Sequence, residues 1–357
     1  MSAKVDTLND FPDEILTHIL SLLPCKDAFR FTVLSKRWIS LCHSLSSLEI
    51  DDKGVNNSKD WIYFRRFMDK VMLSPRAQSL TLKSLDLGCW SQLWEDEPDD
   101  WLEAAKRRGL EKLTLFSFNL RLAPSSMLHC SVDLPFLKSL IMNQIFFEDK
   151  EDFMKLFFGC PKLEYLSIHG IKANGTIVEA NAGVPVGGYF KHLSKLTRAR
   201  ISLISVPLIA VYNVKFLSVW IERSLSDKEI NSFDKSLPMF ENITRLQLSW
   251  SPSISVHDWE VVLKMLQNCP KLQTLTIVKA NNSTTIDWEY PDHVPECVSS
   301  HLTNFKVIGS EACEADFRFA TYILRNARLL QVMSIHHSLH ANLSSCPRIS
   351  PTCKLIQ

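Results

Sequence analysis

Three histidines near the end of the sequence come closest to the spacing of a metal site. His336 and His340 lie four positions apart, which would place both side chains on one helix face within reach of a zinc ion. His337 lies between them, and all three follow an apolar strand phrase, so we expect a loop at this point. The sequence contains no H-E-x-x-H motif. We therefore predict a solvated histidine cluster without a metal ion.

Other residue types that support catalysis lack the surroundings that such chemistry needs. The glycines of the stretch 183–188 have no accompanying P-loop lysine, and no G-x-S-x-G motif presents a serine nucleophile. The ten cysteines include no C-x-x-C pair, which argues against a zinc site and against a disulfide framework. We predict no catalytic residue, no cofactor and no enzymatic activity. A reducing compartment, the cytoplasm and/or the nucleus, is the expected location.

The composition is that of a globular protein rather than a disordered one. Of the 357 residues, 46% are hydrophobic and 22% are charged, and 40 Lys and Arg residues balance 39 Asp and Glu residues. The net charge of +1 gives no field that would attract nucleic acid or an anionic membrane. The most apolar run, residues 201–211, is shorter than the roughly 20 residues that a membrane-spanning helix needs. We predict no nucleic-acid partner and no membrane insertion.

The first fifty residues carry the pattern of three short helices. Apolar residues recur at helical spacing and form one wide face of the first helix, at Ile15, Leu16, Ile19, Leu20 and Leu23. Pro12 suits the first helical position, and Pro24 ends the helix because a residue before proline avoids the α conformation. A second helix is expected over residues 25–31, and a third after the N-cap residue Ser35. So small a unit cannot bury all its apolar surface, and part of it must meet the remaining chain or another protein.

The remaining sequence repeats a phrase of three apolar residues, in which the second follows the first by three positions and the third follows by two. The central residues of its copies are Leu113, Leu140, Leu166, Leu217, Leu246, Leu275, Phe305 and Met333. Neighbouring copies are mostly 26–30 residues apart, which is typical of leucine-rich repeats with one strand and one helix each. Because strand side chains alternate, the last two apolar residues of a phrase share one face of the strand.

Helical patterns precede several copies of the phrase. The clearest covers residues 259–266, and weaker ones cover 153–157 and 317–324. Gly159 and Asn268 follow two of these helices at the same place, which predicts a left-handed C-cap residue at each. Cys160 and Cys269 come next at matching repeat positions, so we expect them to be buried rather than reactive.

The N-terminal residues resemble an F-box. The resemblance rests on Phe11-Pro12, Ile15-Leu16, Ile19-Leu20, Leu23-Pro24 and the run Val33-Leu34-Ser35-Lys36-Arg37-Trp38. Phe11 stands where the family pattern has leucine and keeps an apolar side chain there. The resemblance implies that these helices bind a Skp-type adaptor, which links to a cullin and a RING subunit. It implies adaptor contact for Phe11, Pro12, Ile15, Leu16, Ile19, Leu20, Pro24, Val33 and Leu34. For Trp38 it implies internal packing.

The rest of the chain resembles plant-type F-box proteins with leucine-rich repeats. The phrase Cys-Pro-Lys-Leu-Glu-Tyr-Leu-Ser-Ile at residues 160–168 is typical of these proteins. Their C-terminal FBD region is similar to residues 295–309, 326–328 and 350–353. Together the two resemblances cover nearly the whole sequence.

These observations predict an α/β fold in three parts: a three-helix F-box at residues 7–53, leucine-rich repeats at 54–290, and an FBD-like region at 291–357 that continues the array. Parallel strands would line the concave side of an irregular solenoid, and helices its convex side. The resemblance implies a non-catalytic substrate-recognition subunit of an SCF-type ubiquitin ligase, whose repeats bind an unknown target protein. The alternative is an interaction scaffold without ligase function, in which the first helices only cap the array.

Two segments lie outside the repeat pattern. Acidic residues and a proline separate Trp94 from Trp101 and could receive a basic partner segment. We favour the interpretation that this segment is a solvated loop before a helix. On that helix, Glu103 would form an ion pair with Arg107. The insertion at residues 169–191 is longer than a usual repeat loop, and such loops are either functional or mobile.

Overall fold

The computed structural model divides the chain into two compact units. It describes residues 8–91, 98–117, 121–122, 133–147, 156, 159–173, 193–203, 206, 208–221, 237–251, 256–257, 259–279, 284–285, 290–309 and 311–356. Unit 1 comprises Met1–Leu163 and Gly170–Gly175. Unit 2 comprises Glu164–His169 and Thr176–Gln357.

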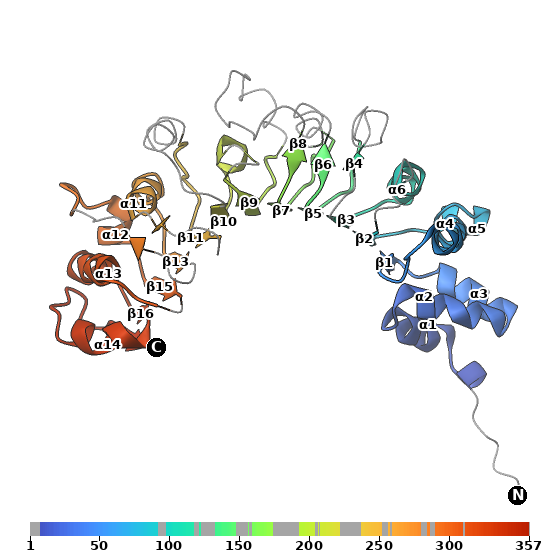
Figure 1. Ribbon diagram of the computed structural model, residues 1–357, viewed down its shortest axis with the longest axis horizontal. Coiled ribbons are helices and arrows are strands. Elements are labelled where there is room, and N and C mark those ends of the chain that lie inside the picture. Colours follow the sequence, from blue (N-terminus) through green and yellow to red (C-terminus); the bar gives the residue numbers. More distant parts are fainter. Residues whose placement is uncertain are drawn as a thin grey trace, which may run out of the picture. The chain divides into compact units, whose positions relative to one another are not determined.

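Unit 1 begins with the three predicted helices, α1 (Asp13–Ser21), α2 (Cys25–Arg30) and α3 (Lys36–His43), shown in blue in Figure 1. Short 3-10 turns lie at Leu8–Asp10 and Phe31–Val33. Pro12 and Pro24 occupy the N-cap positions of α1 and α2. A backbone N–H at this position has no hydrogen-bond partner within the helix, so its absence in proline costs nothing. Pro12 therefore lies one position earlier than predicted. Ser35 is the N-cap residue of α3, as the sequence predicts.

A row of four parallel strands follows in unit 1. Its strands are β1 (Ser47–Asp51), β2 (Ser84–Cys89), β3 (Lys112–Ser117) and β5 (Ser139–Asn143). The helices α4 (Ser58–Met72), α5 (Pro75–Gln78) and α6 (Pro98–Arg107) lie on one side of this row (Figure 1). A small parallel sheet of unit 1 contains β4 (Arg121–Leu122), β6 (Phe146–Phe147) and β8 (Lys172–Ala173).

Unit 2 contains a second row of parallel strands. They are β7 (Tyr165–His169), β9 (Arg198–Ser202), β10 (Phe216–Ile221), β11 (Arg245–Trp250), β13 (Thr274–Val278), β15 (Asn304–Ile308), β16 (Val332–Ser334) and β17 (Lys354–Ile356). The described helices are α11 (Trp259–Gln267), α12 (Glu296–Ser300), α13 (Glu314–Asn326) and α14 (His337–Ser344), with a 3-10 turn at Leu208–Val211. A separate short pair joins β12 (Val256–His257) to β14 (Thr284–Thr285).

The central residues of the apolar phrase face one another from strand to strand. In unit 2, the register pairs Leu217 with Leu246, Leu246 with Leu275, Leu275 with Phe305, and Phe305 with Met333. All five side chains are buried. Each repeat therefore contributes one layer to a continuous core, and this stacking buries the face that a single repeat leaves open. The predicted repeat pattern is confirmed.

Four further strands belong to the rows although the sequence analysis did not identify them. At β2, Leu82 just before the strand and Leu85 and Leu87 within it match the phrase fully and could have been found. In β9, Ala199 stands at the central position and pairs with Leu166 and Leu217, so the small side chain hid the pattern. The full phrase also stands at β1, as Leu45, Leu48 and Ile50, and could have been found, whereas the copy at β17 is incomplete.

The helix ends differ from the prediction at Asn268. Within the described residues, positive φ occurs only at Gln144, Gly109 and Gly170, so Asn268 is not a left-handed cap. Its side-chain Nδ2 instead donates to the carbonyl oxygen of Lys264 at 3.0 Å and satisfies one of the free carbonyls of the last turn of α11. Asn326 does the same for α13, because its Nδ2 donates to the carbonyl oxygen of Tyr322 at 2.9 Å.

The fold class is the one that the sequence predicts. N-terminal helices precede parallel strands with interspersed helices, which is the arrangement of leucine-rich repeats. Among the residues that the structure describes, no helix is long and apolar enough to cross a membrane.

Candidate functional site

The helix α1 has two apolar faces rather than the single wide face that the sequence predicts. Leu16 and Leu20 point inward and are completely buried. Ile15 and Ile19 lie one position before them and remain 45% and 37% exposed. Because neighbouring helical positions are rotated by about 100°, the two pairs divide between the interior and the solvent. In this structure Leu16 and Leu20 are packing residues, and a partner could reach them only if the helices moved.

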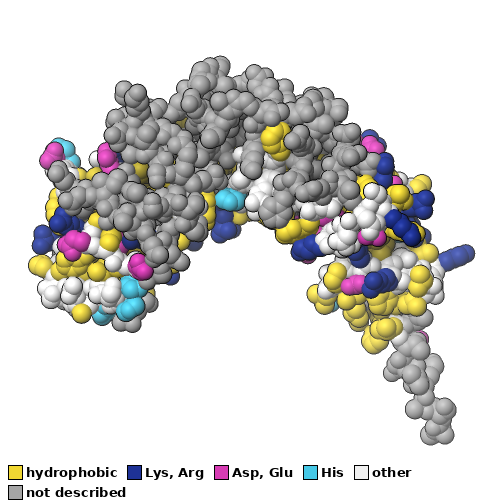
Figure 2. Space-filling model, viewed as in Figure 1, with side chains coloured by type: hydrophobic (Ala, Val, Ile, Leu, Met, Phe, Trp, Pro, Cys, Tyr) yellow, Lys and Arg dark blue, Asp and Glu magenta, His cyan; other side chains and the backbone are white. Residues whose placement is uncertain are grey.

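The exposed apolar surface continues beyond α1. Val33 and Leu34, at the end of the second 3-10 turn, are 85% and 59% exposed. Phe11 is 42% exposed, and Pro12 and Pro24 are also exposed. Figure 2 shows hydrophobic side chains gathered on the surface of α1–α3. Seven of the nine predicted contact residues are therefore accessible to a partner.

Leu8 and Leu22 belong to the same surface but were not among the predicted contacts. Both side chains are exposed, Leu22 at the C-cap of α1 and Leu8 in the 3-10 turn before it. Neither residue fits the family pattern that guided the sequence analysis. Their apolar character beside Pro12 and Pro24 is the signal that could have identified them. Because these residues lie in the part of the chain that resembles an F-box, we name the surface formed by Leu8, Phe11, Pro12, Ile15, Ile19, Leu22, Pro24, Val33 and Leu34 the F-box apolar surface.

The other side of these helices packs against the first repeat. The ring of Phe29 in α2 meets the ring of Phe67 in α4 edge to face, with centroids 5.7 Å apart. The ammonium of Lys26 lies 5.3 Å from the centroid of the Phe64 ring. Trp38 is buried among the helices, as the resemblance implies, and its ring lies 5.0 Å from that of Phe31. The helices thus cover the end of the repeats with one face and leave the opposite face open.

The cysteines near these contacts are unreactive. Burial raises the pKa of the Cys25 thiol to about 12 and that of Cys42 to about 11. In the repeats, burial likewise raises the pKa of Cys160 to about 12, and its Sγ donates to the carbonyl oxygen of Leu156 at 3.3 Å. Cys269 is buried at the matching position, with its pKa raised for the same reason. Thiolate chemistry needs a lowered pKa, so these residues serve packing, which the sequence predicts for Cys160 and Cys269.

The histidine cluster differs from the predicted loop. His336 is the N-cap residue of α14, and its Nδ1 accepts a hydrogen bond from the Ser338 backbone N–H at 3.3 Å. His337 and His340 lie within the helix, and the rings of His336 and His337 are 4.1 Å apart. The apolar phrase before them forms the strand β16, which has only three residues and ends at Ser334. The chain can therefore begin a helix at His337 instead of continuing as a loop. Among the described residues, no group of His, Cys, Asp and Glu could hold a metal ion.

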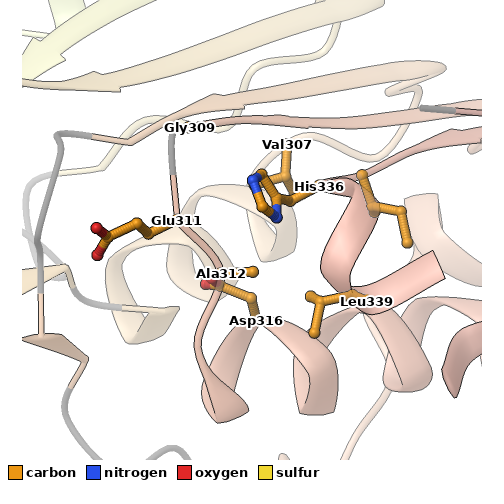
Figure 3. Close-up of a pocket in the computed structure, with 8 residues that line it drawn as sticks. Val307, Gly309, Glu311, Ala312, Asp316, His336 and Leu339 are labelled. Carbon is orange, nitrogen blue, oxygen red and sulfur yellow. The ribbon is translucent and has the colours of Figure 1, made fainter. Parts of the chain in front are cut away.

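A small pocket lies between β15, α13 and α14 of unit 2. Val307, His336 and Leu339 line it together with Asp316, while Glu311 points away from it (Figure 3). Its free space is about that of one water molecule. One carboxylate oxygen of Asp316 accepts from the Lys279 ammonium and from the Cys313 backbone N–H. The pocket is therefore part of the packing of this region rather than a ligand site.

The two segments outside the repeat pattern are partly described. The helix α6 begins at Pro98, within the acidic segment, and Glu103 forms the predicted ion pair with Arg107 at 3.3 Å. Trp101 is buried, and its Nε1 donates to the Asp69 carboxylate at 2.9 Å, so it belongs to the core. Residues 92–97 lie outside the described residues, as do residues 174–191 of the insertion.

Comparisons with known proteins agree with this arrangement of helices and repeats. The F-box domain model matches residues 8–49, and the FBD model matches residues 289–335. One similar relative is an F-box/FBD/LRR-repeat protein from Arabidopsis thaliana, 27% identical over 99% of this chain and 100% of its own length. An FBD-associated F-box protein and a further F-box/FBD/LRR-repeat protein from the same plant are each 28% identical over 92% of this chain and 88% of their own lengths.

The fold defines a repeat protein whose N-terminal helical domain exposes an apolar surface. The chain is an F-box protein with an FBD domain, and its homologues include F-box/FBD/LRR-repeat proteins. An F-box domain implies a Skp-type adaptor as partner, and proteins of this family are generally non-catalytic adaptors.

Proposed function

We propose that the chain is the substrate-recognition subunit of an SCF-type ubiquitin ligase. Its F-box would bind a Skp-type adaptor and through it a cullin and a RING subunit. Its repeats would bind a target protein. The chain would perform no bond chemistry itself and would act in the cytoplasm and/or the nucleus. The proposal keeps the three-part organisation with boundaries at residues 53 and 290, although β1 (Ser47–Asp51) already pairs with the repeat strand β2.

The F-box apolar surface is the observation that carries this proposal. A monomeric protein rarely exposes a contiguous apolar patch of this kind unless another molecule covers it. Val33, Leu34 and Leu22 are each more than half exposed, although they lie on short helices whose opposite face is well packed. Covering each of these side chains would contribute roughly 1.5–3 kcal/mol to binding. The surface therefore favours a stable complex with a partner.

The proposed mechanism depends on proximity. The adaptor, cullin and RING subunit would hold the ubiquitin-charged enzyme at one place, and the repeats would hold the target beside it. A lysine of the target then reacts at a high effective concentration instead of meeting the charged enzyme by diffusion. The role of this chain is to bind both sides at once.

The scaffold alternative receives support from the contacts between the helices and the first repeat. The packing of Phe29 on Phe67 shows that the helices cover the first repeat, as a cap would. A cap has a polar outer face, because nothing binds beyond it. The outer face here carries Ile15, Ile19 and Val33 instead, which favours a docking domain.

Substitutions on the exposed face test the proposal with the full chain. We expect Val33→Asp and Ile19→Asp each to weaken binding of a purified Skp-type adaptor by about 30-fold or more, because a charge would be buried in the interface. Isothermal titration calorimetry measures the affinity, and circular dichroism checks that both variants remain folded. Leu329→Asp is the matched control, since Leu329 is a 52% exposed apolar residue of unit 2.

The outcomes are distinct. Unchanged adaptor affinity in both folded variants would contradict the proposal, and so would the absence of adaptor binding by the unaltered chain. Weakening by Leu329→Asp to the same extent would mean that the loss is not specific to the F-box. The supporting result is loss in the two F-box variants and retention in the control.

A further inference from the structure

The outward-facing strand positions of unit 2 carry positive charge without any negative charge. None of the described strands from β7 to β17 contains Asp or Glu. The exposed charged residues on these strands are Arg198, Arg200, Arg245, Lys306 and Lys354. The strands of unit 1 differ, because Glu49 and Asp86 occupy paired positions there. The positive face is therefore particular to unit 2 and not a general property of these repeats.

The strand register brings three kinds of residue together at the start of β7–β11. Tyr165 pairs with Arg198, Arg198 with Phe216, and Phe216 with Arg245. Arginine and aromatic side chains thus alternate across four neighbouring strands. The guanidinium carbon of Arg198 lies 5.4 Å from the centroid of the Tyr165 ring and 5.9 Å from that of Phe216. Such stacking orients a guanidinium group while its N–H donors stay available.

A second row lies two residues further along the same strands. Arg200 pairs with Ser167 on β7 and with Ser218 on β10. The guanidinium carbon of Arg200 lies 5.9 Å from the centroid of the Phe216 ring, so both arginines of β9 rest on this ring. The small serine side chains on either side leave space for a partner's side chain to approach Arg200. Dark blue Lys and Arg side chains are visible beside β9 and β10 in Figure 2.

The three arginines are not neutralised within the described part of the chain. There, Arg198, Arg200 and Arg245 form neither an ion pair nor a side-chain hydrogen bond, and all three are exposed. Guanidinium groups match carboxylates in two parallel hydrogen bonds. A face that holds three such groups between aromatic rings is complementary to a chain that carries both acidic and apolar side chains.

We propose that the face at Tyr165, Arg198, Arg200, Phe216 and Arg245 binds an extended acidic segment of the target protein. This inference rests on the proposed function, since it names the kind of target segment that the repeats would hold. The four strands span about 14 Å, which an extended peptide of about five residues crosses. Arg198 and Arg245 lie two strands apart, about 10 Å, with Phe216 between them. They therefore face separate carboxylates, whereas a single phosphate would need convergent arginines.

Fluorescence anisotropy with the full chain tests the inference. The probe is a labelled peptide of about a dozen residues that contains Glu and Leu, long enough to cross the four strands. We expect it to bind, and to bind more weakly as salt concentration rises, because exposed charges are screened. Arg198→Ala and Arg245→Ala should each lower its affinity about tenfold. Lys215→Ala is the matched control, since Lys215 is an exposed cation just before β10 that lies outside the face.

Further arms decide between the possible ligands and separate this inference from the proposed function. A peptide with Lys in place of Glu should not bind the unaltered chain, and the double variant R198E/R200E should reverse this preference. The inference would be overturned if the Glu and Lys peptides bound equally well, or if Lys215→Ala lowered peptide affinity as much as the arginine variants do. Tighter binding of a phosphoserine peptide or of a single-stranded RNA would also overturn it. Adaptor affinity should stay unchanged in every variant of this face. Peptide failure with adaptor binding intact refutes the acidic segment alone, while loss of adaptor binding by the unaltered chain refutes the proposed function.

Discussion

Arg37 of α3 binds Asp13 of α1 and joins the first and last helices of the F-box. Its Nε lies 2.8 Å from Oδ1 of Asp13, and a terminal nitrogen of the same guanidinium lies 2.6 Å from that oxygen. The guanidinium also donates to the carbonyl oxygen of Phe11 at 2.6 Å. One arginine therefore fixes the start of α1, where Phe11 and Ile15 reach the solvent. This gives a physical role to the arginine of the Ser-Lys-Arg-Trp run.

We expect Arg37→Ala to loosen α1 without unfolding the chain. The ion pair is well exposed, so its loss should lower the local stability of the F-box by only about 1 kcal/mol. Hydrogen exchange of peptides from α1 should then be faster, and adaptor affinity should fall a few-fold because the apolar surface is less well ordered. Arg37→Lys keeps the positive charge but loses the planar guanidinium that donates to both Asp13 and Phe11. It should therefore show a smaller increase in exchange rate and a smaller loss of adaptor affinity. Unaltered exchange in α1 would refute this role.

The two faces of α1 should respond differently to truncation. Leu20→Ala leaves a cavity in a completely buried site and should lower the free energy of unfolding of the F-box region by about 2–5 kcal/mol. Ile19→Ala removes a partly exposed side chain, so it should change stability by less than about 1 kcal/mol while weakening adaptor binding. Thermal unfolding and calorimetric titration of both variants measure this difference. Equal destabilisation by the two changes would contradict the division of faces.

The repeat rows could be predicted because their signal is local and strong. A buried parallel strand needs apolar residues at fixed spacing, and Leu246 and Leu275 keep that spacing from one repeat to the next. The prediction missed β9 because Ala199 fills the central position with a small side chain. The prediction that Asn268 is a left-handed C-cap residue was also wrong. An asparagine after a helix can either adopt that conformation or bind a carbonyl of the preceding turn with its side chain, and the sequence does not distinguish the two.

The candidate site was predicted in outline but not in its division between interior and surface. Periodicity places Ile15, Leu16, Ile19 and Leu20 on one broad side of a helix. Which of them is buried depends on how α3 packs against α1, and this contact includes the bond from Arg37 to Asp13, two residues that are distant from each other in sequence. The arginine and aromatic face of unit 2 was missed altogether, because the register that aligns Arg198 with Phe216 is a property of the folded strands.

The buried ion pair between Lys279 and Asp316 should be sensitive to single substitutions. Both side chains are at most 3% exposed and connect the end of β13 to α13. Lys279→Met or Asp316→Leu alone should lower the free energy of unfolding by about 3–5 kcal/mol, because each leaves the other group buried without its partner. The double variant Lys279→Met with Asp316→Leu should recover most of this loss. Urea unfolding followed by circular dichroism tests this, and additive losses in the double variant would contradict it.

His43 should make the stability of the F-box depend on pH. Its side chain is buried at the end of α3, and burial, with a smaller effect of nearby Arg76, lowers its pKa from the ordinary value of 6.5. The unfolded chain therefore takes up a proton at higher pH than the folded chain does. The folded F-box therefore has its full stability above pH 6.5, where His43 is neutral in both states. This stability is lost as the pH falls from 6.5 toward the lowered pKa of His43 in the folded chain.

Hydrogen exchange of α3 peptides between about pH 7 and pH 5 measures this effect, after correction for intrinsic exchange rates. We expect His43→Gln to flatten the loss of protection on acidification. His18→Gln, on the exposed side of α1, controls for the removal of a histidine as such. An unchanged pH profile in His43→Gln would show that another group causes the dependence.

The most direct test of the account is the protection of individual side chains in the complex with a Skp-type adaptor. Hydroxyl-radical footprinting with mass spectrometry reads the solvent exposure of Phe11, Ile15, Ile19, Val33 and Leu34 with and without the adaptor. If the F-box apolar surface binds the adaptor, these residues become strongly protected, while Leu329 and Tyr212 of unit 2, 52% and 48% exposed, remain as reactive as before. A complex that forms without protecting the F-box apolar surface would contradict the account.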